Sequence, residues 1–193
     1  ANDAMTPAGA ISALEHLENY QIVIGQLEIP QEVTIAAFKK AKDFGAITIL
    51  NPAPFALISP DLISVSDWII PNESEFAGMH PQGLGPTSDE NILEIAATLK
   101  TRFVVTLGEK GAAFTTRDGE IRRVAAPQVK AIDTTGAGDA FVGAFAVGLA
   151  AHLSDEKAIA LGCACASESV TRKGTQSSYP TPAQAQEILR SID

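Results

Sequence analysis

The 193-residue chain has few cysteines, few basic residues and no long apolar run. Its two cysteines are too few for a disulfide framework. Lys and Arg number 14 against 23 Asp and Glu, and a surface with a formal charge of −9 argues against binding nucleic-acid phosphates or anionic membranes. Gly, Pro or charged residues interrupt the apolar stretches well before the roughly 20 residues of a membrane span. The opening sequence ANDAMTPAGA also lacks the pattern of a signal peptide. We therefore expect a soluble, cytoplasmic protein with no nucleic-acid or membrane partner.

The remaining composition is that of a folded globular protein. Hydrophobic residues make up 46% and charged residues 19% of the chain. The length corresponds to one domain, and we expect a single domain over residues 1–193.

Strand and helix patterns alternate along the chain. Apolar, β-branched runs predict strands over 21–27, 46–50, 67–70 and 102–106. Capping and periodicity predict helices over 6–19, 30–44, 138–151, 154–170 and 181–192, and one that a capping box at 87–90 starts and that ends near 100. Asp118-Gly119 predicts a hairpin between 112–116 and 121–125, and residues 79–87 are expected to form a loop. This order predicts an α/β fold with a mostly parallel sheet covered on both faces.

Most of the Gly- and Pro-rich loops follow strands. These are residues 51–54, 71–75 and 106–111, and the turn 133–139 precedes a predicted helix. Ligands of open α/β sheets bind at the carboxyl ends of strands, so we expect these loops on one edge of the sheet.

The segment DTTGAGD, residues 133–139, carries the strongest chemical signal. Gly136 and Gly138 allow a tight turn whose backbone N–H groups point outward at a helix N-terminus, a geometry that binds anions. Asp139, in the first helical turn, could accept a proton from a hydroxyl that attacks a phosphoryl group. The alternative is that Asp139 only caps the helix.

Six segments resemble the ribokinases of the PfkB family of carbohydrate kinases, in the same order along the whole chain. They are QLEIP (26–30), ILNPAP (49–54), PNESE (71–75), TLGEKGA (106–112), AIDTTGAGDAFVGAF (131–145) and VTRKGTQSSYP (170–180). The resemblance implies a three-layer α/β/α fold, truncated at its N-terminus, since the family's β lid and main sugar-binding segment precede these motifs. It implies ATP-dependent phosphorylation of D-ribose to ribose 5-phosphate.

The resemblance also implies roles for individual residues. Asp139 corresponds to the catalytic base, and Gly136, Ala137 and Gly138 to the anion hole, with Gly138 and Asp139 against the nucleotide phosphates. The ATP-binding residues would be Asn72 and the run Thr106, Leu107, Gly108, Glu109, Lys110 and Gly111. Glu28 corresponds to a sugar contact, beside Asp139.

Two cations follow from the same resemblance. Glu75 would hold Mg²⁺ through water. K⁺ would be bound by oxygens, mostly backbone carbonyls, of Asp133, Thr135, Ser169, Arg172, Gly174 and Ser178. Taken without the resemblance, Asn72 and Glu75 are also explained as a helix start with a dipole-favoured Glu.

One position departs from the family pattern. Cys163 stands where ribokinases usually carry an Asn near the adenine, and with Cys165 it is expected to be a core thiol rather than a metal ligand. Three alternatives to a ribokinase remain: another PfkB kinase acting on a different sugar or a nucleoside, a nucleotide-binding fragment without turnover, and a structural fragment without a ligand. Surfaces exposed by truncation could also support a homo-oligomer.

Overall fold

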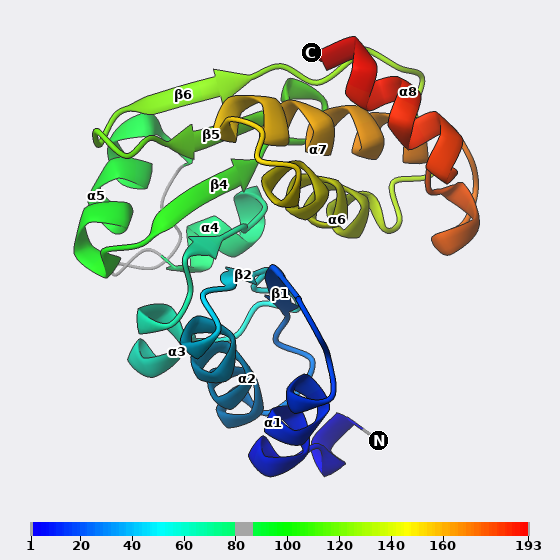
Figure 1. The fold of residues 1–193 in the computed structure, drawn as a ribbon. Coiled ribbons are helices and arrows are strands. Elements are labelled where there is room, and N and C mark those ends of the chain that lie inside the picture. The colour runs from blue at the N-terminus through cyan, green and yellow to red at the C-terminus, as the bar shows by residue number, and fades with distance from the viewer. Residues whose placement is uncertain (1, 80–86, 193) are drawn as a thin grey trace. The chain divides into compact units, whose positions relative to one another are not determined.

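The computed structural model describes residues 2–79 and 87–192, in which helices and strands alternate (Figure 1). The helices are α1 (Pro7–Glu15), α2 (Gln31–Asp43), α3 (Pro60–Ser64), α4 (Glu73–Met79), α5 (Asp89–Leu99), α6 (Ala137–Ala150), α7 (Asp155–Ser169) and α8 (Pro182–Ile192). The strands are β1 (Ile22–Gly25), β2 (Ile47–Leu50), β3 (Trp68–Ile69), β4 (Arg102–Thr106), β5 (Ala112–Thr115) and β6 (Ile121–Val124). Short 3₁₀ helices η1 (Asn2–Ala4), η2 (Gly108–Lys110) and η3 (Gln176–Ser178) complete the described elements.

The six strands form one sheet in chain order, from β1 to β6. β1 to β4 pair in parallel, with Ile22 opposite Ile47, Ile49 opposite Trp68, and Ile69 opposite Phe103. β5 turns back beside β4, and β6 follows it across the Asp118-Gly119 turn, so the sheet is mixed (Figure 1). The α/β class, the mostly parallel sheet and the hairpin are therefore confirmed.

The chain packs as two compact units. Unit 1 comprises residues 1–105 and 114–122, and unit 2 comprises residues 106–113 and 123–193. Unit 1 thus contains most of the sheet and the helices α1 to α5, whereas unit 2 contains the turn after β4 and the helices α6 to α8.

Each unit has its own apolar core. In unit 1 the fully buried side chains include Phe38 of α2, Ile49 of β2 and Phe103 of β4, and Phe103 meets Phe76 edge to face at 6.4 Å between ring centroids. In unit 2, α6 packs along α7, where Phe145 and Ile159 are fully buried. Since burial of one large apolar side chain contributes about 1.5–3 kcal/mol, these clusters are the main source of stability in each unit.

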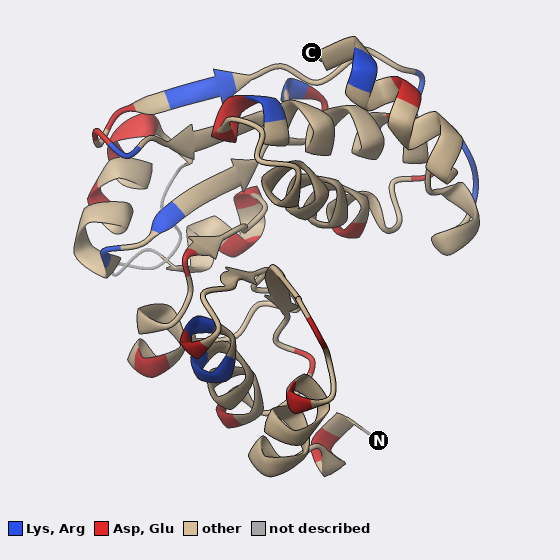
Figure 2. Cartoon of the chain, viewed as in Figure 1, with Lys and Arg blue, Asp and Glu red and all other residues tan. Residues whose placement is uncertain are grey.

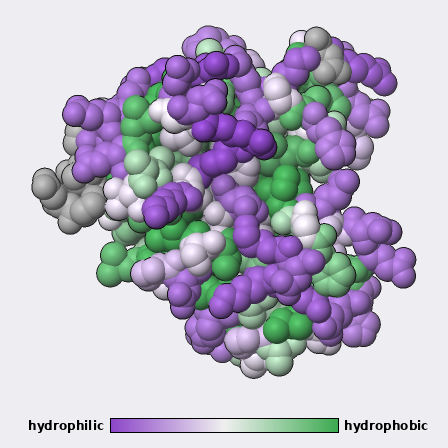
Figure 3. Space-filling model, turned by 60° about the vertical axis from the view of Figure 1, so that its left-hand side comes forward, coloured by the Kyte–Doolittle hydropathy of each residue, from purple (hydrophilic) through white to green (hydrophobic). Residues whose placement is uncertain are grey.

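Large apolar side chains that reach the surface lie mostly at loops and element ends. Leu57 is 84% exposed in the loop after β2, Phe44 is 63% exposed at the end of α2, and Leu17 is 56% exposed after α1. On the face shown in Figure 3, hydrophobic atoms accordingly occur between hydrophilic ones. Isolated exposure of this kind is ordinary for globular proteins.

Several element bounds differ from prediction for local reasons. α1 ends at Glu15 rather than near residue 19, and Asn19 itself adopts a left-handed φ of 58° that an α-helix does not include. Pro30 is the cap of α2 rather than its first residue. The predicted capping box started at Thr87, but the helix cap is Ser88, whose hydroxyl accepts from the Asn91 N–H at 3.2 Å.

Of two short helices, α3 was not predicted, and the start of α4 was expected only as the alternative explanation of Asn72 and Glu75. α3 begins at Pro60, after Ser59 accepts a hydrogen bond from the Leu62 N–H, and α4 begins at Glu73. The predicted loop 79–87 lies mostly outside the described residues, and Met79 belongs to α4.

Candidate functional site

The turn before α6 lies in unit 2 and depends on Gly136. This residue caps α6 with φ 79°, a left-handed conformation that costs other residues about 1–2 kcal/mol. A Cβ at this position would also lie 2.8 Å from the hydroxyl oxygen of Tyr179. A glycine is therefore needed both for the backbone conformation and for the approach of the tyrosine.

The start of α6 presents backbone donors of two kinds. The Ala137 N–H donates to the Thr134 carbonyl at 3.2 Å, and the Ala140 N–H makes the first helical bond, to Gly136. The Gly136 and Gly138 N–H groups donate to no acceptor among the described residues, and a Cβ at Gly138 would meet no atom within 4 Å. Of the three amides predicted for an anion hole, those of Gly136 and Gly138 thus have open capacity, whereas Ala137 is committed to the turn.

Asp139 is exposed in the first turn of α6, where a carboxylate is stabilised by the helix dipole. The half-buried Tyr179 lies near it: partial burial raises the pKa of the phenol, and the negative charge of Asp139 raises it further. Tyr179 belongs to the segment VTRKGTQSSYP, but its contact with Gly136 and Asp139 was not predicted. Tyr179 lies 40 or more residues after Gly136 and Asp139 in the sequence, so no local sequence signal could have indicated this contact.

Asp133 joins the two segments that were predicted to share K⁺. Its Oδ1 accepts from the Thr135 N–H at 3.0 Å and hydroxyl at 2.7 Å, and its Oδ2 accepts from the Gly174 N–H at 3.0 Å. The hydrogen bond from Thr135 and those from the Gly174 and Thr135 amides lower the pKa of Asp133 to about 2. The carboxylate is therefore ionised over the whole physiological range and ties the turn before α6 to the loop after α7.

The loop after α7 is held by an arginine side chain. Arg172 pairs with Glu168 at 2.6 Å and donates to the Ser178 carbonyl at 2.8 Å. Ser178 is fully buried and its hydroxyl donates to the Thr175 carbonyl at 2.7 Å, while Ser169 is 1% exposed. The structure thus joins Asp133 to Gly174 by one hydrogen bond and Arg172 to Ser178 by another, and the pairing of Arg172 with Glu168 was not predicted.

The predicted ATP segment after β4 forms a tight turn on itself. The Leu107 N–H donates to the Gly111 carbonyl at 2.8 Å, and Gly108 to Lys110 form η2. Leu107 and Gly111 are buried, so the exposed part of this turn is Gly108, Glu109 and Lys110. A Cβ at Gly111, whose φ is 94°, would lie 2.0 Å from the Val124 carbonyl oxygen, which requires glycine there.

In unit 1, polar side chains connect the carboxyl ends of the parallel strands. The buried Asn51 follows β2, accepts from Gln26 Nε2 at 3.3 Å and donates to the Ile70 carbonyl at 2.9 Å. It thereby links the loops after β1, β2 and β3. Glu28 is exposed in the loop after β1, two residues beyond Gln26. The structural role of Asn51 was missed, because its partners lie about 20 residues away in either direction.

Asn72 and Glu75 bond to each other at the start of α4. The Glu75 N–H donates to Asn72 Oδ1 at 2.8 Å, and the Asn72 N–H donates to Glu75 Oε2 at 2.8 Å. This reciprocal cap satisfies two donors at the helix start. Glu75 is 9% exposed, and burial raises its pKa despite the bond from the Asn72 amide. The helix-start explanation of this motif is therefore present in the structure, and Glu75 Oε1 is the carboxylate oxygen that the cap leaves available.

Both cysteines are buried, as core thiols are expected to be. Cys163 and Cys165 are buried free thiols, and burial raises the pKa of Cys163 to about 12, which makes it inert. The described residues contain no group of three or more His, Cys, Asp or Glu side chains that could hold a metal ion. Within the described ranges, no helix combines the length and apolar character that crossing a bilayer requires.

Comparison with known proteins identifies the family. The model of the pfkB family of carbohydrate kinases matches residues 1–182. The chain belongs to this family. Its sequence is 37% identical over 188 residues to a ribokinase of Staphylococcus aureus, covering 93% of this chain and 60% of that protein. It is 38% identical over 195 residues to a deoxyribokinase of Salmonella typhi, covering 98% of this chain and 62% of that protein.

Solved structures agree with the sequence matches. The ribokinase of Thermotoga maritima superposes with a TM-score of 0.84 at 32% identity, covering 98% of this chain and 63% of that one. The Arabidopsis thaliana ribokinase, complexed with ribose and ATP, gives a TM-score of 0.80 at 30% identity, covering 88% of this chain and 56% of that one. The ribokinase-like fold is thereby confirmed. The chain spans about 60% of the length of its curated relatives.

Proposed function

We propose that this chain is the part of a sugar kinase that transfers the γ-phosphoryl group of ATP to a hydroxyl of D-ribose, giving ribose 5-phosphate. The observation that carries the proposal is the start of α6, where an exposed Asp139 stands beside outward backbone donors and open space over Gly138. Family membership and the ribokinase similar to this chain that was solved with ribose and ATP support it.

Asp139 acts as the general base in this proposal. Its carboxylate accepts the proton of the sugar 5-hydroxyl as that oxygen attacks phosphorus, a contribution of typically 10²–10⁴-fold in rate. The Gly136 and Gly138 amides donate to the oxygens of the transferring phosphoryl group, where charge must be stabilised during in-line transfer. The positive end of the α6 dipole acts in the same direction.

The remaining substrate contacts follow the roles that the resemblance to ribokinases implies. In unit 2 the exposed residues Gly108 to Lys110 contact the adenosine part of ATP, and the buried Leu107 and Gly111 shape that turn. Thr106 ends the preceding strand and positions it. In unit 1, Asn72 contacts a phosphate, and the exposed Glu28 binds a sugar hydroxyl.

The donor chemistry fits the two implied cations. Glu75 offers one carboxylate oxygen outside its cap, and Mg²⁺ needs few protein carboxylates because it keeps waters and binds substrate phosphates. Bound Mg²⁺ would neutralise charge on the phosphates. For K⁺, Asp133, the carbonyls of Thr135, Ser169, Arg172 and Gly174, and Ser178 would supply an all-oxygen set, which suits a hard cation. The hydrogen bond from the Gly174 N–H to Asp133 supports this grouping. Bound K⁺ would fix the loop that carries the anion hole.

The test is ADP release by this chain with ATP, Mg²⁺, K⁺ and D-ribose, compared with Asp139→Asn. We expect ribose-dependent turnover that falls at least about 10²-fold in the variant. Its urea unfolding shows whether the variant is folded. Turnover that persists in the variant would remove Asp139 from the role of base.

A second candidate substrate is 2-deoxyribose, because a deoxyribokinase matches this chain as well as the ribokinases do. Parallel assays with D-ribose, 2-deoxy-D-ribose and fructose compare their kcat/KM values. If kcat/KM is higher for 2-deoxyribose than for ribose, 2-deoxyribose is the preferred substrate. If it is highest for fructose, the chain has another PfkB activity. ATP binding without turnover on any sugar would leave a nucleotide-binding module.

A further inference from the structure

Tyr179, which follows η3 in unit 2, packs against the turn that begins α6. Apart from the neighbouring residues, the three atoms nearest to the Cβ position of Gly136 all belong to the tyrosine side chain. They are the hydroxyl oxygen at 2.8 Å, Cε1 at 3.2 Å and Cζ at 3.4 Å. The ring therefore covers the side of Gly136 on which any other residue would carry a side chain.

Hydrogen bonds hold the two ends of this turn. Before it, the Ile132 N–H donates to the carbonyl of Val170, the cap of α7, at 2.7 Å. After it, the Ala140 N–H donates to the Gly136 carbonyl at 2.9 Å. These bonds anchor the backbone, but they do not pack the face of Gly136 that lacks a side chain. On that face the nearest contacts come from Tyr179.

The backbone around Tyr179 is itself constrained. Its N–H donates to the Gln176 carbonyl at 3.4 Å. The preceding Ser178 is fully buried, and its carbonyl accepts from Arg172 Nη2 at 2.8 Å. The following Pro180 has a φ that its ring fixes. The tyrosine ring thus extends from a segment that is held on both sides, which allows the ring to restrain the turn that it contacts.

Tyr179 adds no charge to the start of α6. Asp139 is the only charged residue of that helix (Figure 2), and a phenol is neutral at pH 7. The ring can therefore pack on Gly136 without repelling the phosphate that is proposed to bind beside it.

The restraint matters because the proposed reaction depends on where two amides point. Glycine has more backbone freedom than other residues, and this turn contains both Gly136 and Gly138. Donors stabilise a transition state only when they are aimed at the place where charge develops. A misplacement of about 1 Å can lower a rate about 10²-fold.

We propose that Tyr179 is a positioning residue for phosphoryl transfer. Its ring restrains Gly136 in the left-handed conformation and thereby orients the Gly136 and Gly138 amides toward the phosphate. The tyrosine acts through the glycine and not by contact with ATP. This inference rests on the proposed function, because it identifies the residue that holds the anion-binding turn of that reaction in place.

Three replacements separate the ring from the hydroxyl. Tyr179→Phe keeps Cε1 and Cζ against Gly136, so ATP affinity in calorimetric titration and kcat for ribose-dependent ADP release should stay within about two-fold of the wild type. Tyr179→Leu removes the ring and should weaken ATP binding about five-fold. It should lower kcat about ten-fold, because the amides are then misaligned in the transition state, and leave the KM for ribose unchanged. Tyr179→Met, a second variant without the ring, should match Tyr179→Leu.

Tyr20→Leu is the matched control. Tyr20 is the other tyrosine of the chain and lies in unit 1, where its ring contacts the Phe44 ring at 5.6 Å between centroids. Because this replacement also removes a packed ring, it should lower stability in urea unfolding but leave ATP affinity and kcat unchanged. A loss of ATP affinity at Tyr179 alone separates positioning of the turn from general destabilisation.

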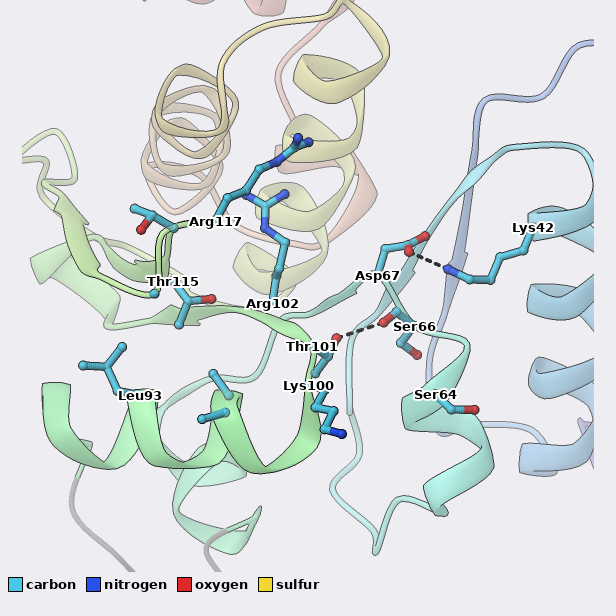
Figure 4. A pocket seen from close by; sticks show the side chains of 14 residues that line it. Lys42, Ser64, Ser66, Asp67, Leu93, Lys100, Thr101, Arg102, Thr115 and Arg117 are labelled. Carbon is cyan, nitrogen blue, oxygen red and sulfur yellow. Dashed lines mark hydrogen bonds and ion pairs between the residues drawn. The ribbon is translucent and has the colours of Figure 1, made fainter.

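A cavity of about 640 Å³ in unit 1 must be distinguished from the start of α6 as the place where ATP binds (Figure 4). It lies at the amino ends of β3 and β4, where Lys42 pairs with Asp67 at 2.5 Å. The exposed Arg117 lines this cavity, so Arg117→Gln tests whether ATP phosphates bind there. This variant should bind ATP as the wild type does.

The proposal is overturned if Tyr179→Leu and Tyr179→Met bind ATP and turn over like the wild type, or if Tyr20→Leu loses as much ATP affinity as they do. An equal loss in Tyr179→Phe would assign the effect to the hydroxyl and also overturn it. A loss of ATP affinity in Arg117→Gln alone would place ATP in the unit 1 cavity, with the same consequence.

The proposed function can fail separately. Wild-type protein that binds ATP but releases no ADP with any sugar would contradict the kinase function alone, and the ATP affinities of the Tyr179 variants would still decide whether the ring positions the turn. Wild-type protein that binds no ATP would overturn both.

Discussion

The two units differ in how a helix N-terminus uses its hydrogen-bonding groups. In unit 1, Asn72 and Glu75 form hydrogen bonds with each other at the start of α4. In unit 2, the start of α6 leaves the Gly136 and Gly138 amides without a protein acceptor. The same structural element, a helix N-terminus, is thus closed by its own side chains in one unit and open to a ligand in the other. Changes in the closed start should alter stability, and changes in the open start should mainly alter ligand affinity.

The largest expected effect is a loss of stability when a glycine in unit 2 whose Cβ would clash with the backbone is replaced by alanine. Gly111→Ala should lower the free energy of unfolding by about 3 kcal/mol or more, because its Cβ would lie 2.0 Å from the Val124 carbonyl oxygen at a φ of 94°. Gly108→Ala is the matched control: its φ is 58° with open space around the Cβ, so the loss should be about 1 kcal/mol. Urea denaturation of both variants measures the difference, and equal losses would contradict the steric argument.

The next effect separates affinity from stability at the open helix start. Gly138→Ala should keep or slightly raise stability, because nothing lies within 4 Å of its Cβ. It should weaken ATP binding about ten-fold, or about 1.4 kcal/mol, since the methyl group occupies the space proposed for phosphate. Gly143→Ala, in the middle of the same helix and equally unobstructed, should leave ATP affinity unchanged. Calorimetric titration checks both, and an unchanged affinity in Gly138→Ala would place ATP elsewhere.

Substitution at the start of α4 should lower the stability of the protein. Asn72→Ala removes the acceptor of the Glu75 N–H and should cost about 1 kcal/mol, the usual value of a cap. Ser88→Ala, which removes the corresponding cap of α5, provides the reference within the same unit. Thermal and urea unfolding measure both losses. A much smaller loss for Asn72 than for Ser88 would show that the reciprocal pair is not a structural cap.

The smallest effect is a pH dependence of opposite sign in the two units. The pKa of Asp133 is lowered to about 2, so its contribution to stability is present above pH 4 and is lost as pH falls from 4 to 2. Asp133→Asn should therefore destabilise the protein at pH 7 and approach the wild type near pH 2.

Burial raises the pKa of Glu75, so its neutral form is favoured in the fold and stability falls as pH rises above 4.5. Glu75→Gln should match or exceed the wild type at pH 7. Unfolding measured from pH 2 to 7 distinguishes the two, and parallel profiles would contradict the assignment.

Much of the fold could be predicted because its signals are local. Thr6 and Ser154 cap their helices as their sequence positions indicate, accepting from the backbone three residues on. Asp118-Gly119 forms the expected turn, with Gly119 at a φ of 78°. α3 was missed and α4 was anticipated only at its start, because helices of 5 and 7 residues are too short for an apolar period to show.

The candidate site was predicted in part from residues and in part from resemblance. The turn at Gly136, Gly138 and Asp139 has a local chemical signature, and the structure places it at the start of α6 as expected. The grouping of Asp133 with Gly174 came only from the resemblance to ribokinases, and the hydrogen bond between them spans 41 residues. The K⁺ and Mg²⁺ assignments, the substrate and the oligomeric state remain predictions.

The sequence by itself determined where helices begin, where the chain turns, and which glycines accept positive φ, because these depend on interactions within about four residues. Only the tertiary structure decided which donors remain open. It directed the Ala137 N–H to the Thr134 carbonyl, paired Asn72 with Glu75, and placed Tyr179 against Gly136. Those outcomes depend on how distant segments pack, and a hydrogen-bonding group has a free capacity only after all its neighbours are in place.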